Sequence, residues 1–153
     1  MLAIGTEAPD FSLRSHRGKT VHLADLRGQQ RALLVFYPKD DTPGCTAQLC
    51  AIRDNFAALN GYDVTPFGIN ADDEAAHTAF AQGQHYQFDL LVDEGLGVAR
   101  SYDAATEGSA TPQRTVYIVG KDGTIIFAER GAPSPAEMIS AVKDAGDEAA
   151  ALA

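Results

Sequence analysis

Hydrophobic and polar positions along this chain follow two periods, one typical of strands and one typical of helices. Residues 31–37 are apolar on both faces, which predicts a buried strand. Over residues 47–59 the apolar side chains recur at helical spacing, and Pro66 weakens the next strand because it cannot donate to a ladder. The remaining pattern predicts strands at 10–13, 20–23, 64–69, 88–92, 115–119 and 124–128, and helices at 72–81, 94–102 and 135–143.

This order of elements predicts an α/β fold. Strands that alternate with helices imply a mainly parallel central sheet covered by helices on both faces. The first two strands form an N-terminal β-hairpin extension, and the last two, around the turn at 120–123, add antiparallel strands. The result is a thioredoxin-like fold with a central mixed sheet. At 153 residues, the chain is predicted to be a single domain over 1–153, with an alanine-rich end at 149–153 that frays.

Charge narrows the classes of partner. The chain has 12 Lys and Arg against 21 Asp and Glu, a formal net charge of −9. Nucleic acid and anionic membranes both need a basic face, so we expect neither as a partner. The start of the sequence lacks the basic and apolar regions of a signal peptide, and no apolar run approaches the roughly 20 residues of a membrane span. We therefore expect a cytoplasmic protein.

The two cysteines are the first candidates for chemistry, because cytosolic disulfides are usually transient and catalytic. Both follow the buried strand at 31–37. Thr42 is a good N-cap and Pro43 a good first helical residue, which places Cys45 in the first turn of a helix. Free amide donors and the positive end of the helix dipole favour a thiolate there. The sequence therefore predicts an activated nucleophile at Cys45.

The spacing between Cys45 and Cys50 carries a second prediction. Five residues along an α-helix separate two Cα atoms by about 8–9 Å, whereas a disulfide needs roughly 4.4–6.8 Å. If both cysteines lie on one helix, they cannot pair until its first turns unwind. Gly44 lowers the helical propensity where that unwinding must happen. A disulfide between them would therefore be a catalytic intermediate that requires a conformational change.

Other interpretations of the cysteines are less favoured. Cys50 taken alone would read as a small buried hydrophobic residue. A zinc site is less favoured because it needs further ligands, and no histidine lies in this segment. A thioredoxin-type motif has two residues between its cysteines, whereas four separate this pair.

At this segment the chain resembles the peroxiredoxins, and in particular the subfamily called bacterioferritin comigratory protein or PrxQ. The family's Pro-x-x-x-Thr-x-x-Cys pattern falls on Pro38, Thr42 and Cys45, and the second cysteine at position 50 is typical of the subfamily. Similarity also covers 5–13, 36–55 and 114–119. The resemblance therefore involves nearly the whole chain.

The resemblance implies a role for each of these residues. Cys45 would be the peroxidatic cysteine, oxidised to sulfenic acid, and Cys50 the resolving cysteine that condenses with it. Thr42 would offer its hydroxyl to the thiolate and the peroxide, Pro38 would shield the site from water, and Arg114 would hold the thiolate and polarise the peroxide. The substrates would be hydrogen peroxide and organic hydroperoxides. The enzyme would act as a monomer without haem, flavin or metal, and thioredoxin or a similar dithiol would reduce it again.

Several interpretations stay open at this point. Arg53 either pairs with an acid or reaches the site, and Gln48 is interpreted as a local hydrogen-bonding residue. His77 is interpreted as a helix residue rather than a catalyst, and the other histidines as surface residues: His16, His22 and His85. The alternative functions are a thiol–disulfide oxidoreductase that acts on proteins and a redox-sensing binding protein.

Overall fold

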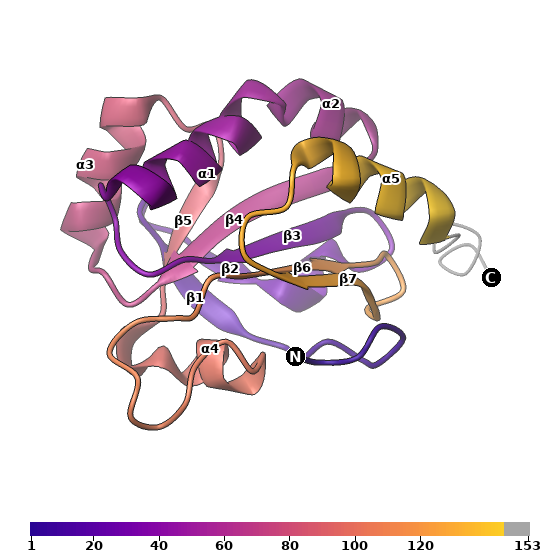
Figure 1. The fold of residues 1–153 in the computed structure, drawn as a ribbon, viewed down its shortest axis with the longest axis horizontal. Helices are drawn as coiled ribbons and strands as arrows, with labels where there is room; N and C mark the ends of the chain where they lie inside the picture. Colours follow the sequence, from indigo (N-terminus) through magenta and orange to yellow (C-terminus); the bar gives the residue numbers. More distant parts are fainter. Residues whose placement is uncertain (146–153) are drawn as a thin grey trace.

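A computed structural model describes residues 1–145 of the chain, so the alanine-rich end at 149–153 lies outside the described residues. The strands are β1 (Ser12–Ser15), β2 (Thr20–His22), β3 (Arg31–Phe36), β4 (Val64–Asn70), β5 (Asp89–Val92), β6 (Thr115–Val119) and β7 (Ile125–Arg130). The α-helices are α1 (Pro43–Asp54), α2 (Phe56–Gly61), α3 (Glu74–Gln84), α4 (Gly97–Ser101) and α5 (Pro135–Ala145), and short 3-10 helices span Leu23–Leu26 (η1) and Glu94–Leu96 (η2). Figure 1 shows how these elements are arranged.

The strands form one mixed sheet in the order β2-β1-β5-β4-β3-β6-β7. The three central strands β5, β4 and β3 are parallel to one another, and every other pairing is antiparallel. The expected N-terminal hairpin is formed by β1 and β2, and β1 attaches it to β5. The mixed sheet is thus confirmed, while its parallel part is confined to the centre.

Helices lie on both faces of the sheet, but unequally (Figure 1). On one face, α1, α2, α3 and α5 bury their apolar side chains against β3, β4, β5 and β6. The other face is covered by the N-terminal segment, η1 and α4 with the residues that follow it. β3 is buried along its whole length because it has a strand on each side and an apolar layer on each face. This explains its unbroken run of apolar residues.

Pro66 lies within β4, a central strand, although proline removes a backbone donor. β4 pairs with β3 along its length, where Pro66 lies opposite Leu33, but its ladder with β5 begins only at Phe67. Only one neighbouring strand is therefore paired at the level of Pro66. This position makes a proline tolerable in a strand that is otherwise central.

The single helix predicted at 47–59 is wrong in its extent. α1 begins earlier, at Pro43, as the cap at Thr42 predicts, and it ends at Asp54. Asn55 leaves helical geometry with φ −114° and ψ 15°, and its side-chain amide donates to the Ala51 carbonyl oxygen at 2.8 Å. α2 starts directly after it, so the apolar periodicity continues across two helices. Within residues 1–145, no helix is both long and apolar enough to cross a bilayer.

Candidate active site

The site begins where β3 leads into α1. Thr42 has the extended backbone of an N-cap, and Pro43 occupies the first helical position, so Cys45 lies in the first turn as predicted. The Thr42 hydroxyl does not cap the helix. It donates to the Lys39 carbonyl oxygen at 3.0 Å, while the Thr42 carbonyl accepts from the Thr46 amide at 2.8 Å. Thr42 therefore closes the turn that precedes α1, the helix that carries Cys45 in its first turn.

Cys45 is buried, with 1% of its surface exposed, and lies against a cation. The Arg114 guanidinium donates from Nη2 to the Cys45 Sγ at 3.3 Å. Arg114 directly precedes β6, which pairs with β3, so the pairing of these two strands brings it to the start of α1 although it is 69 residues away in sequence. A guanidinium and the positive end of a helix both stabilise a thiolate. The arrangement therefore suits Cys45 to act as a nucleophile.

Gln48 was missed as a long-range partner. It is buried one turn after Cys45, accepts from Arg114 Nη1 at 2.6 Å and donates to the Gly131 carbonyl oxygen at 3.4 Å. The interpretation of Gln48 as a local hydrogen-bonding residue is therefore wrong. Its spacing of three from Cys45, which puts both side chains on one helix face, is the signal that could have indicated it.

Cys50 lies in a different environment on the same helix. It is half-buried, and its Sγ lies 3.5 Å from Gln84 Oε1 and 3.6 Å from the Tyr86 hydroxyl. Burial and the neighbouring Cys50 raise the pKa of Tyr86 far above its usual value, so this hydroxyl stays protonated and can donate. Arg53 pairs with an acid, Asp54, at 2.9 Å, which is one of the two alternatives considered for it, and it also donates to the Gln84 carbonyl oxygen at 2.8 Å.

Both cysteines carry free thiols, and both lie on α1. The condition stated for their pairing, that both lie on one helix, is therefore met. At helical spacing their Cα atoms are about 8–9 Å apart, too far for a disulfide. A bond between them requires the first turns of α1 to unwind.

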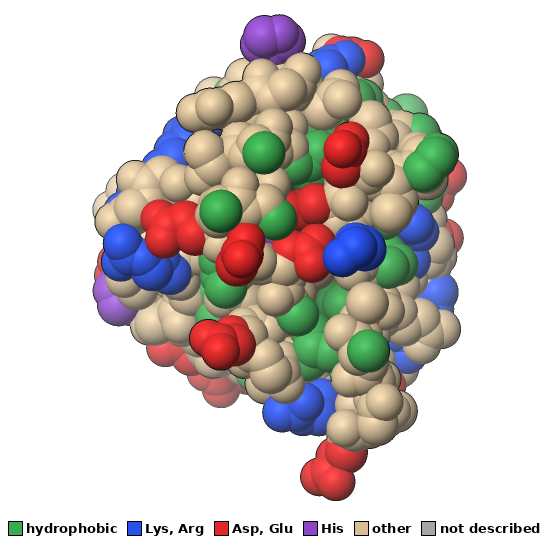
Figure 2. All heavy atoms as spheres, turned by 90° about the vertical axis from the view of Figure 1, so that its left-hand side faces the viewer, with side chains coloured by type: hydrophobic (Ala, Val, Ile, Leu, Met, Phe, Trp, Pro, Cys, Tyr) green, Lys and Arg blue, Asp and Glu red, His purple; other side chains and the backbone are tan. Residues whose placement is uncertain are grey.

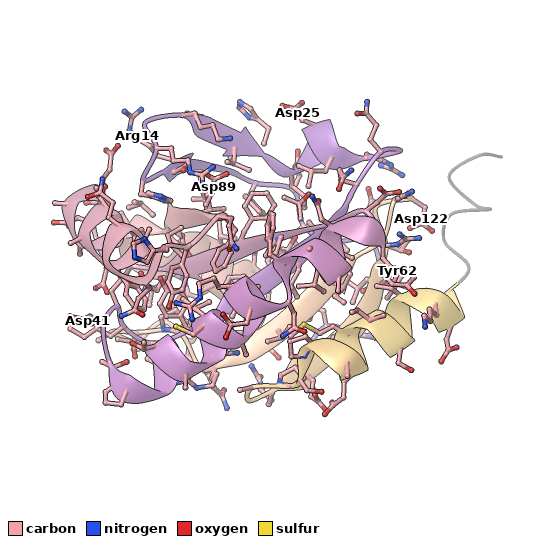
Figure 3. All side chains as sticks on the ribbon, turned by 90° about the horizontal axis from the view of Figure 1, so that it is seen from above. Arg14, Asp25, Asp41, Tyr62, Asp89 and Asp122 are labelled. Carbon is pink, nitrogen blue, oxygen red and sulfur yellow. The ribbon has the colours of Figure 1, made fainter. Side chains whose placement is uncertain are left out.

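The surroundings of the site are acidic on one side. A hollow of about 400 Å³ lies between the loop before α1 and α3, and its lining includes Asp40, Asp41 and Asp72. Figure 2 shows the face of the molecule that carries α3, with acidic side chains gathered near its centre. Asp41 lies where α1 begins (Figure 3). Pro38, in the same loop, is half-buried.

Most of the histidines lie as interpreted, and His16 differs. His77 does lie on a helix, α3, but it is fully buried and hydrogen-bonded through both ring nitrogens. His16 is half-buried, and its Nδ1 accepts from the Leu90 amide at 3.0 Å. This burial lowers the pKa of His16. The interpretation of His16 as a surface residue is therefore wrong, whereas His22 and His85 are exposed.

Comparison with known proteins places these features in a family. The profile of the AhpC/TSA family matches residues 4–128. The chain belongs to the AhpC/TSA family. Among curated AhpC/TSA relatives, it is 38% identical over 124 residues to the chloroplastic peroxiredoxin Q of Triticum aestivum, covering 80% of this chain and 57% of that protein. It is 34% identical over 130 residues to the putative peroxiredoxin bcp of Coxiella burnetii, covering 81% and 85%.

Comparison with solved structures finds the same architecture. Peroxidoxin BcpB from Mycobacterium tuberculosis superposes with a TM-score of 0.83 at 25% identity, covering 94% of this chain and 96% of that one. The resemblance to peroxiredoxins and the thioredoxin-like fold are thus confirmed. The chain spans just over half the length of the plant relatives. The roles of the individual residues in this AhpC/TSA protein stay predictions.

Proposed function

We propose that the protein is a thiol-dependent peroxidase that reduces hydrogen peroxide and organic hydroperoxides. The contact between Arg114 and Cys45, made at the start of the helix that also carries Cys50, is the observation that carries the proposal. An ordinary thiol is ionised to only a few per cent at pH 7. A cation and a helix terminus both favour a thiolate, and here both remain in place as charge develops on the departing oxygen.

In the first step, the Cys45 thiolate attacks one oxygen of the hydroperoxide. A sulfur–oxygen bond forms, the oxygen–oxygen bond breaks, and the departing oxygen leaves as an alcohol or water after it takes up a proton. Cys45 becomes a sulfenic acid. Arg114 has two nitrogens engaged, Nη1 with Gln48 and Nη2 with Cys45, so its plane is held while the bonds change. The Thr42 hydroxyl, at the same turn, is a second donor that the peroxide can recruit from Lys39.

In the second step, α1 unwinds at its first turn and Cys50 attacks the Cys45 sulfur. The sulfur–sulfur bond forms and the hydroxyl of the sulfenic acid leaves as water. A dithiol such as thioredoxin then reduces the disulfide and is itself oxidised. Since both cysteines lie on one chain, the cycle needs no second copy, and we propose that the monomer is sufficient. We propose the cytoplasm as its compartment, where reduced dithiols are maintained.

The burial of Cys45 argues against the alternative of a protein disulfide oxidoreductase. With 1% of its surface exposed, Cys45 is accessible to a small peroxide far more readily than to a disulfide on another protein. A redox-sensing binding protein would react once and then stay oxidised, whereas the peroxidase is recycled.

Intact mass and thiol titration after one equivalent of hydrogen peroxide test the proposal. We expect both thiols to disappear within seconds, with the loss of two hydrogens and with the protein still monomeric. Adding thioredoxin and its reductase should then restore both thiols repeatedly. Thiols that survive for many minutes would contradict the peroxidase, and an oxidised protein that thioredoxin does not reduce would favour the sensor.

A further inference from the structure

A buried polar cluster lies next to the site and has no role in the cycle above. His77 on α3 has none of its surface exposed. Its Nδ1 lies 2.5 Å from Asp40 Oδ2, and its Nε2 lies 2.9 Å from the Leu91 carbonyl oxygen. A carbonyl only accepts, so Nε2 carries a proton, and a second proton is shared between Nδ1 and the Asp40 carboxyl. The imidazole therefore joins Asp40 to β5.

Asp40 is held at more than one point. Its Oδ1 accepts from the Tyr37 hydroxyl at 2.6 Å and from the side-chain Nδ2 of Asn70 at 3.1 Å. Its backbone amide donates to Asp72 Oδ2 at 2.7 Å. Both the side chain and the main chain of Asp40 are thus tied to residues at the end of β4 and to α3. Buried networks in which every member has a partner hold one geometry.

Only a short, constrained stretch separates Asp40 from the helix of Cys45. Asp41 has φ +58°, a left-handed conformation that non-glycine residues seldom adopt and that persists where the surroundings enforce it. Thr42 follows as the N-cap, and Pro43 fixes φ at the first helical position. The position of Asp40 therefore sets where α1 begins, and with it where Cys45 meets Arg114. Figure 1 shows this segment passing beside α3.

We propose that His77 and Asp40 form an anchor that positions Cys45 against Arg114. The inference deepens the proposed function, on which it rests. His77 acts through Asp40 and does not touch the reacting atoms, so it is a positioning residue. During unwinding of α1, Asp40 remains the fixed upstream end, and the helix refolds from it once the disulfide is reduced. Loosening the anchor is expected to weaken the reaction of Cys45 with peroxide and to favour the unwound state that forms the disulfide.

Two substitutions at position 77 separate the two hydrogen bonds of the imidazole. In asparagine the amide nitrogen is as many bonds from Cα as Nδ1, so His77→Asn can keep the link to Asp40. In glutamine it is as many bonds away as Nε2, so His77→Gln can keep the link to Leu91 and lose Asp40. Tyr37→Phe removes another donor to Asp40 with little change in volume. Glu74→Gln is the control, because within residues 1–145 the Glu74 side chain pairs with Arg14 at the surface, away from Asp40.

The readout is the rate at which iodoacetamide alkylates Cys45 as a function of pH, with Cys50→Ser as the common background. This measures the thiolate without peroxide. We expect His77→Gln to move the alkylation profile to higher pH, with about a tenfold lower rate below neutral pH for a shift of one unit. Tyr37→Phe should shift the profile in the same direction. The rates of His77→Asn and Glu74→Gln should stay within about twofold of the parent. A general disturbance of α3 would instead change the rates of these two variants as well.

Unchanged profiles in His77→Gln and Tyr37→Phe would overturn the anchor, as would equal shifts in His77→Asn and His77→Gln. If His77→Gln does not fold, Tyr37→Phe decides the matter. The outcome is independent of the peroxidase itself. A parent protein that ignores hydrogen peroxide but shows the expected alkylation profiles would contradict the proposed function and leave the anchor standing.

Discussion

Cys45 and Cys50 are the same residue type on the same helix, yet the fold gives them different surroundings. Cys45 is buried in the first turn and faces the Arg114 guanidinium at 3.3 Å. Cys50 is half-buried and more than a turn further along, where it faces two neutral groups, the side chain of Gln84 and the hydroxyl of Tyr86. Cys45 has a guanidinium in direct contact with its sulfur and lies near the free amides of a helix terminus, whereas Cys50 has neither.

This difference shows how two thiols on one helix can be given different chemical surroundings. A cation and the end of the helix dipole stabilise a thiolate, and so favour the first attack on peroxide. In the proposed cycle, Cys50, with its neutral hydrogen-bonding partners, remains a thiol until the sulfenic acid forms on Cys45. The regular helix also keeps the two apart, because its geometry prevents their bonding before it unwinds.

The largest effect is expected from removing Cys45. In Cys45→Ser, hydrogen peroxide should disappear no faster than in buffer, because a serine hydroxyl is neither ionised nor readily oxidised. A colorimetric assay of remaining peroxide, with thioredoxin and its reductase present, measures this. Full activity in this variant would transfer the nucleophile to Cys50 and remove the distinction drawn above.

Removing Cys50 should separate the two halves of the cycle. Cys50→Ser is expected to oxidise Cys45 at a rate within about twofold of the parent, because the contact with Arg114 is retained. Turnover with thioredoxin should stop after one event. Mass spectrometry after trapping with dimedone should find the sulfenic acid on Cys45. Normal turnover would mean that another thiol resolves the sulfenic acid.

The two arginines near the cysteines provide a matched test of charge. Arg114→Ala should slow oxidation of Cys45 by about 100-fold, the usual loss when one charge-stabilising donor is removed. Arg53→Ala removes a guanidinium that contacts Asp54 and Gln84 but not Cys45, and should change the same rate by less than about twofold. Stopped-flow measurement of the second-order rate constant compares them. Equal losses would show that overall charge, rather than the contact with Cys45, matters.

The smallest effect is expected at Tyr86. Its hydroxyl stays protonated because burial raises its pKa, so it can donate to the Cys50 thiolate as that thiol ionises. Tyr86→Phe should slow disulfide formation about fivefold, the value of one hydrogen bond, and leave oxidation of Cys45 unchanged. Rapid quenching and thiol counting give both rates. Tyr62→Phe, at an exposed tyrosine, is the control, and an equal effect there would exclude a specific role for Tyr86.

Features that depend on neighbouring residues could be predicted from the sequence. Thr42 and Pro43 locate the start of α1, and that start places Cys45 in the first turn, because capping and proline preferences act within a few residues. Strand and helix order followed from periodicity for the same reason. The split of the helix at Asn55 was not predicted, since the apolar spacing continues across it.

Contacts between distant segments could not be predicted from spacing alone. The resemblance to peroxiredoxins indicated Arg114, but no local pattern pairs Gln48 with it, places Gln84 and Tyr86 around Cys50, or buries His77 against Asp40. Each of these contacts depends on which strands are adjacent in the sheet and on how the helices lie across it.

By itself, then, the sequence predicted that Cys45 lies in the first turn of a helix, that one helix holding both cysteines would keep them beyond disulfide range, and that strands and helices alternate around a central sheet. These are local properties, governed by backbone preferences and helical geometry. The tertiary structure decided how the charged partner reaches Cys45 and which other side chains surround the two cysteines. The pairing of β3 with β6 brings Arg114 to Cys45, and the packing of α3 brings His77 to Asp40, because side chains remote in sequence meet only after the core has formed.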